Sequence, residues 1–130
     1  MSLSVSRVLR EQAERGPVEA DDFLACVRES LPYAYGTVAG LAGELSRTDR
    51  EFVDNVVPPP DEQAHGELLR ALASDAIRGA IERHFDVRLA FQNCHRVAVF
   101  RPGATGGAAY RDFTSARSQV LNQAPDLVNC

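Results

Sequence analysis

The chain has 130 residues and a mass of 14.2 kDa, the size of a typical single domain. Apolar residues make up 45% of it, which is enough for a buried core and argues against a disordered chain. The net charge of −4 at pH 7 argues against a general nucleic-acid-binding protein, because such proteins usually carry a basic stripe. All fourteen basic residues are Arg, which excludes catalysis by a lysine amine.

The sequence also bears on where the protein works. No apolar run approaches the roughly 20 residues that are needed to cross a bilayer, and the first residues lack the pattern of a secretion signal. Cys26, Cys94 and Cys130 are widely spaced and include no CxxC pair, so neither a disulfide framework nor a zinc site is expected. We therefore expect a cytoplasmic protein that has no membrane partner.

Three helices are expected in the first 45 residues. Ser4–Arg15 has apolar residues on one side and is followed by a glycine, which is typical of a helix end. Glu19–Leu31 has acidic residues in its first turn and apolar residues at helical spacing. Tyr33–Leu45 follows Pro32 and is rich in Gly and Ala, which lets another backbone approach closely. We expect this helix to take part in a homodimer.

The middle of the chain contains a connector and one long helix. Residues 46–60 are expected to form the connector, with one helical turn at Glu51–Asn55 and a stiff proline triplet at its end. Asp61 is a good N-cap, and apolar residues then recur at helical spacing over Glu62–His84. This pattern predicts a single continuous helix.

Beyond the long helix the apolar period changes from helical spacing to every second residue. Val87–Phe91 and Val97–Phe100 are expected to be the strands of a β-hairpin, with one long strand as the alternative. The Gly-rich loop 103–107 is either a linker or a mobile lid. Residues 110–121 predict a last helix, which ends before Pro125. The expected fold is a mostly helical α+β single domain over residues 1–130, with one β-hairpin packed on a helical bundle.

One face of the hairpin is a candidate binding surface. Alternation turns one set of side chains towards the helices and the other set away from them. The outward set combines two cations with small and aromatic residues, which suits an extended peptide or a second subunit. An ordinary solvated sheet face is the alternative. The expected substrate-binding residues on this face are Arg88, Gln92 and Phe100.

Candidate catalytic residues lie at and beyond the hairpin turn. His95 suits a general acid because imidazole titrates near neutral pH. Asn93, Arg96 and Arg101 are candidates for stabilising a developing oxyanion. Cys94 is a poor nucleophile for His95 to activate, because neighbours in a strand point to opposite faces. No phosphate-binding loop or metal-ligand cluster occurs in the sequence, so we expect no cofactor and no metal.

Two stretches carry a resemblance to a known family. The stretch Leu89–Pro102 (LAFQNCHRVAVFRP), together with Leu68–Asp75 (LLRALASD) in the preceding helix, resembles the small lysinoalanine-forming proteins of the cinnamycin and duramycin lanthipeptide pathways. The resemblance implies a cofactor-free homodimer that binds a modified peptide during antibiotic biosynthesis. It also implies conjugate addition of a peptide Lys amine to dehydroalanine, a ring closure that depends on holding two ends together.

Three functions follow as hypotheses. The leading one is a small cofactor-independent enzyme that acts on a modified peptide, with lysinoalanine formation as its sharpest form. The alternatives are a non-catalytic peptide- or protein-binding dimerisation module and a cofactor-free isomerase or cyclase for a small molecule. None of the three requires a nucleic-acid partner.

Overall fold

A computed structural model describes residues 3–92 and 96–122. The fold class expected from the sequence, mostly helical α+β, is confirmed. Among the described residues, none of the helices is long and apolar enough to cross a membrane. In chain order the elements are α1 (Arg7–Arg15), α2 (Ala20–Ser30), α3 (Pro32–Ser46), β1 (Phe52–Asp54), α4 (Glu62–Ala73), α5 (Asp75–Phe85), β2 (Arg88–Gln92), β3 (Arg96–Phe100), η1 (Pro102–Ala104), α6 (Ala108–Phe113) and α7 (Ala116–Leu121).

The sheet is antiparallel and, within the described residues, has the strand order β1-β3-β2. The hairpin is confirmed: β2 pairs with β3, with Ala90 opposite Ala98. The sequence did not predict β1, which lies in the expected connector and pairs with the other side of β3, Val53 opposite Val99. Its three residues are too few to show an alternating pattern. The expected helical turn at Glu51–Asn55 is wrong for the same segment.

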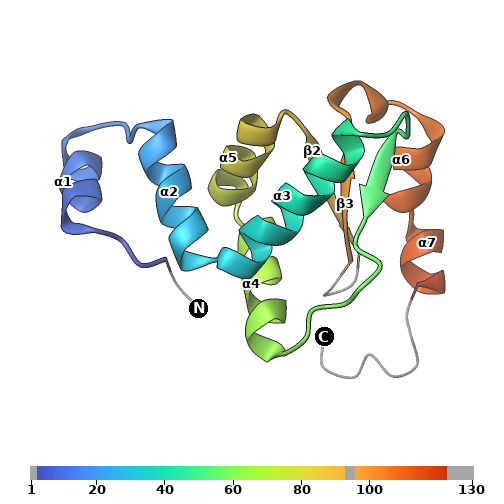
Figure 1. Cartoon of the computed structure of the whole chain (residues 1–130), viewed down its shortest axis with the longest axis horizontal. Helices are drawn as coiled ribbons and strands as arrows, with labels where there is room; N and C mark the ends of the chain where they lie inside the picture. The colour runs from blue at the N-terminus through green and yellow to red at the C-terminus, as the bar shows by residue number, and fades with distance from the viewer. Residues whose placement is uncertain (1–2, 93–95, 123–130) are drawn as a thin grey trace.

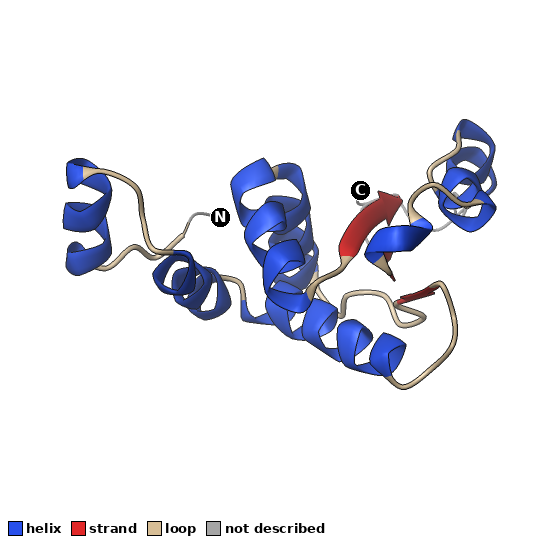
Figure 2. Cartoon of the chain, turned by 90° about the horizontal axis from the view of Figure 1, so that it is seen from above, coloured by secondary structure: helices blue, strands red, loops and turns tan. Residues whose placement is uncertain are grey.

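Helices cover both faces of this sheet. The larger core lies on one face, where buried residues of α2 to α5 pack against Val53, Leu89, Val97 and Val99. The smaller core lies on the other face, where Phe113 of α6 packs against side chains of β2 and β3. In Figures 1 and 2, α1 stands at one end of the molecule and α6 and α7 stand at the other.

Two expected helices are each divided in two. Glu62–His84 forms α4 and α5 because Ser74 leaves the helical conformation, with φ −98° and ψ 117°, and its side chain caps α5 by accepting from the Ile77 N–H at 3.3 Å. Likewise, Ser115 caps α7 by accepting from the Ser118 N–H at 3.1 Å, which separates α7 from α6. A serine that can cap the following turn offers an alternative to helix continuation.

Candidate functional site

The outward face of the hairpin is not a surface, and that expectation was wrong. Ala98 and Phe100 are fully buried, and Ala90 nearly so. The Phe100 ring stacks on Phe52 with 4.7 Å between ring centroids and meets Tyr110 and Phe113 edge-on. Helix α6 therefore covers the face that was expected to bind substrate. Phe100 is a core residue, which leaves it unable to contact a ligand unless α6 is displaced.

Gln92 and Arg96 are brought together by the sheet, but they bind other parts of the protein. The Gln92 side chain donates to the Phe113 carbonyl at 2.5 Å and accepts from Arg96 at 3.4 Å. Arg96 donates from two guanidinium nitrogens to one oxygen of Asp54 at 2.9 and 2.5 Å. The same guanidinium lies 5.4 Å from the centre of the Phe113 ring. These contacts tie β1, β2 and α6 to β3.

Arg101 and Arg88 lie apart from this cluster. Arg101 donates to the carbonyls of Leu45 at 2.8 Å and Thr48, so it caps the C-terminal end of α3. Arg88 is exposed and lies 3.8 Å from Glu82 of α5. Asn93 and His95 fall outside the described residues, so the structure does not test their expected roles. Arg96 and Arg101 are the expected catalytic residues that the structure describes, and both of them connect secondary-structure elements.

The hollow that Gln92 and Arg96 line is small. It has a volume of about 150 Å³ and lies between the sheet and α6–α7. Pockets for drug-sized ligands have volumes of about 300–1,000 Å³, so this hollow is too small for a peptide. Among the described residues, no group of three or more His, Cys, Asp or Glu is placed to hold a metal ion.

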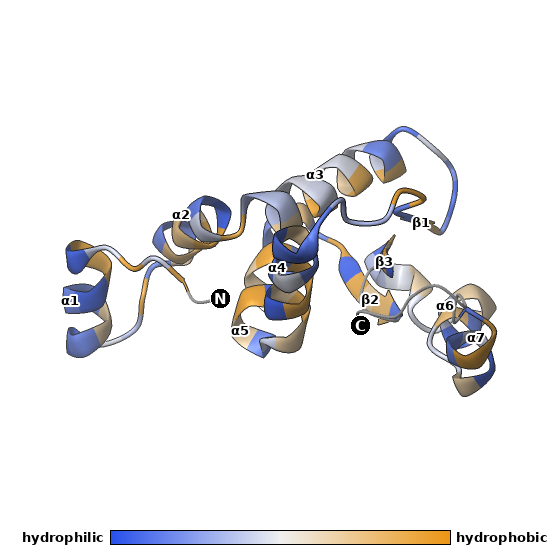
Figure 3. Ribbon diagram, turned by 90° about the horizontal axis from the view of Figure 1, so that it is seen from below, coloured by the Kyte–Doolittle hydropathy of each residue, from blue (hydrophilic) through white to orange (hydrophobic). Residues whose placement is uncertain are grey.

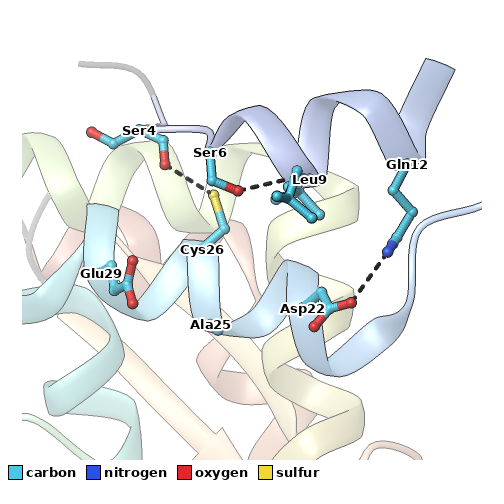
Figure 4. A pocket seen from close by; sticks show the side chains of 9 residues that line it. Ser4, Ser6, Leu9, Gln12, Asp22, Ala25, Cys26 and Glu29 are labelled. Atoms are coloured by element: carbon cyan, nitrogen blue, oxygen red, sulfur yellow. Dashed lines mark hydrogen bonds between the residues drawn. The ribbon is translucent and has the colours of Figure 1, made fainter.

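A hollow of about 320 Å³ lies between α1 and α2 (Figure 4). The Cys26 thiol donates to the Ser4 carbonyl at 3.5 Å, and the Gln12 side chain donates to Asp22 at 3.3 Å. The Ser6 hydroxyl accepts from the Leu9 N–H at the start of α1. The contacts of Cys26 and Gln12 hold α1 and the residues before it against α2. Cys26 is buried and belongs to this packing.

A groove with largely apolar walls lies between α2 and α5. Its volume is about 660 Å³, which is large enough for several side chains of a partner. Ala76 and Ala80 are one turn apart on α5 and face Phe23 and Leu24 of α2. Because an alanine side chain ends at Cβ, this pair leaves space between the two helices. Figure 3 shows α1 as largely hydrophilic and parts of α5 as hydrophobic.

Charged residues stand at one end of this groove. Asp21 lies on the α2 wall, and Arg83 and His84 lie on the α5 wall. Neither Asp21 nor Arg83 forms an ion pair with another of the described residues. The Arg83 guanidinium lies along α5 above Gly79, where an added Cβ would be only 3.0 Å from it. The groove was not predicted from the sequence, although the alanines at i and i+4 of α5 were a signal for it.

Comparison with known proteins identifies a family. The whole chain, residues 1–130, matches the model of a family named KH_NucS_shadow and described as NucS shadow ORF. The chain belongs to this family. No curated protein and no solved structure matches the chain. The resemblance to lysinoalanine-forming proteins is therefore wrong: short stretches of similar pattern had suggested it, and no diagnostic motif supported it.

The family description names a reading frame that shadows NucS and states no activity. KH is also the name of a nucleic-acid-binding module in which a GXXG loop clamps the backbone of four nucleotides. A candidate place for such a loop is the junction of α4 and α5, the helix pair between β1 and β2.

The junction of α4 and α5 does not have the form of that clamp. The single residue Ser74 joins the two helices, and the Asp75 carboxylate beside it is 92% exposed. This carboxylate forms an ion pair with Arg78 at 2.5 Å, so the cation nearest to the junction is already bound to an anion. The GXXG sequences of the chain begin instead at Gly40, inside α3, and at Gly103, in η1. The described residues therefore form no GXXG loop at the helix junction.

Proposed function

We propose that this chain is a non-catalytic protein-interaction module that binds an apolar segment of a partner between α2 and α5. The observation that carries the proposal is the groove itself, about 660 Å³ in volume and walled by Phe23, Leu24, Ala76 and Ala80. Exposed concave apolar surfaces of this kind are typical of interaction sites on soluble proteins.

The contacts of the polar residues support binding over catalysis. Arg96 is bound to Asp54, Gln92 to the Phe113 carbonyl, and Arg101 to the end of α3. A residue that stabilises a reacting group must direct its donors at the substrate. The donors of these three residues bind other parts of the protein and are not directed at a substrate. The described residues of the expected catalytic site therefore do not support a peptide-modifying enzyme. The hypothesis of lysinoalanine formation rested on the family resemblance, and it has no specific support because that resemblance is wrong.

The experiment fills the groove and measures binding. A fluorescein-labelled amphipathic helical peptide with a Leu stripe is titrated with the full chain, and its anisotropy is followed. Ala76→Trp places an indole in the groove, and Ala76 is exposed, so the fold tolerates the change. Ala13→Trp makes the same change at an exposed position of α1 outside the groove.

We expect the unaltered chain and Ala13→Trp to bind the peptide equally well. Ala76→Trp is expected to weaken binding at least tenfold, because the indole occupies the volume that the partner's side chains need. Equal binding by both variants would place the interaction elsewhere on the protein. Absence of binding by the unaltered chain would remove the proposed function.

A further inference from the structure

The two walls of the α2–α5 groove differ in charge. The last turn of α5, with Arg83 and His84, lies beside the start of α2, with Asp21, so these residues meet at one end of the groove. Figure 1 shows the two helices as neighbours. Arg83 therefore makes the α5 wall cationic, and Asp21 makes the α2 wall anionic. Both Asp21 and Arg83 are exposed and form no ion pair with the described residues, so their charges are open to a partner.

The shape of the groove favours a helix as its occupant. Two helices form its walls, and an amphipathic helix binds such a groove by laying its apolar stripe along the floor. Side chains at i, i+3, i+4 and i+7 of the partner would then meet Ala76, Ala80 and Leu24. The two flanks of the partner's stripe would face the two walls, one cationic and one anionic.

We propose that the partner segment is an amphipathic helix that carries an acidic residue on the flank facing Arg83 and a basic residue on the flank facing Asp21. This inference rests on the proposed function. Opposite charges on the two walls fix the direction in which the helix lies, because a reversed helix places like charges against each other. A symmetric apolar groove would not distinguish the two directions.

The test uses two peptides of the same composition. Both have one Leu stripe, and they differ only in that the Glu and Arg flanks are exchanged. The full chain is titrated into each labelled peptide at low salt, where interactions between exposed charges are least screened. Charge-reversed protein, with Asp21→Arg and Arg83→Glu together, is titrated in parallel. Both positions are exposed, so the double variant is expected to fold.

We expect the unaltered chain to bind one peptide about five- to tenfold more tightly than the other. This ratio reflects two exposed charge pairs that are attractive with one peptide and repulsive with the other. The charge-reversed protein should prefer the opposite peptide. Equal binding of both peptides by the unaltered chain would overturn the charge inference and leave the proposed function intact. Failure of both peptides to bind would overturn the proposed function as well.

A second copy of this chain is the competing occupant. Amide NMR spectra of the protein alone, at tens and at hundreds of micromolar, report on it directly. We expect the signals of Phe23, Leu24, Ala76 and Ala80 to stay in place over this range. Shifts of these signals with protein concentration would show that the groove binds another copy, and this would overturn the proposal.

Discussion

The Glu67 carboxylate of α4 accepts a hydrogen bond from the Tyr33 N–H at 2.7 Å and a second from the Ala34 N–H at 3.3 Å. Glu67 is only 3% exposed. The two amides belong to the first turn of α3, where N–H groups have no partner within the helix and a negative charge is favourable. At the other end of α3, Arg101 donates to the Leu45 carbonyl. Opposite charges from α4 and from the residue after β3 thus stabilise the two ends of α3.

Glu67→Ala is expected to lower the free energy of unfolding by about 1–3 kcal/mol, because it leaves buried N–H groups of α3 without an acceptor. Chemical denaturation followed by circular dichroism measures the change. Glu29→Ala, at an exposed position of α2, is the control and should change stability little. Equal effects of the two substitutions would contradict the capping role.

Arg101→Ala is expected to lower the free energy of unfolding by about 1–2 kcal/mol, since several carbonyls lose a charged donor. Arg88→Ala is the matched control. The Arg88 side chain is 58% exposed and 3.8 Å from Glu82, so its removal should cost less than about 0.5 kcal/mol. If Arg101→Ala left stability unchanged, its guanidinium would be free for another role, as the sequence analysis had suggested.

Phe113→Ala is expected to destabilise the protein by about 3 kcal/mol, a loss typical of removing a buried ring. Phe113 is 5% exposed and packs against Phe52 and Phe100. Because α6 and α7 have six residues each, neither forms a stable helix without packing. Hydrogen exchange of the α6 amides should accelerate along with the loss of stability. Leu121→Ala, at a position 62% exposed, should leave both measurements unchanged.

Much of the fold was predictable because its signals are local. Asp61 was expected to cap the helix that follows, and it accepts from the Ala64 N–H at 2.8 Å. The hairpin was predicted from alternating apolar residues on both sides of one turn. The break at Ser74 was not predicted, because the apolar face of α4 continues into α5 and conceals the cap. A helical period shows which residues are buried but does not show where the helix is interrupted.

The candidate site was much less predictable than the fold. Alternation placed Gln92 and Phe100 on one face of the hairpin, but it could not show that α6 covers this face. That cover depends on contacts between Phe100 and Phe113, which lie on different elements. The α2–α5 groove likewise arises from residues more than 50 positions apart, such as Phe23 and Ala76. The alanines at i and i+4 mark one wall of the groove, but a local sequence pattern does not show which helix lies opposite them.

The purified chain is expected to unfold in one cooperative transition. The large core contains fully buried Leu31, Leu68, Ile81 and Val99. Domains of this size usually unfold in a two-state manner. Heating monitored by circular dichroism and by tyrosine fluorescence should give coincident curves, whereas a gradual, non-cooperative loss of signal would show that no such core forms.

The homodimer remains a prediction. One reason to expect it is that a two-stranded hairpin is marginally stable on its own and can gain a strand or a face from a second chain. The hairpin does not need a second chain, because β1 and α6 already pack against it. The small-residue face of α3 still favours association. Added Cβ atoms at Gly36 and Gly40 would meet nothing within 4 Å, and both glycines line a groove of about 460 Å³.

We propose that two copies associate through this face of α3. Val56 and Val57, which are 90% and 70% exposed, line the same groove and can cover the glycines of the partner copy in a two-fold arrangement. Light scattering coupled to gel filtration should give about twice 14.2 kDa. Gly40→Leu should give the monomer mass, because its side chain prevents close approach of the two backbones. Gly103→Leu, at a glycine that is also open but lies in η1, should remain dimeric. A monomeric unaltered chain at tens of micromolar would end the dimer prediction, and a dimeric Gly40→Leu variant would move the interface away from α3.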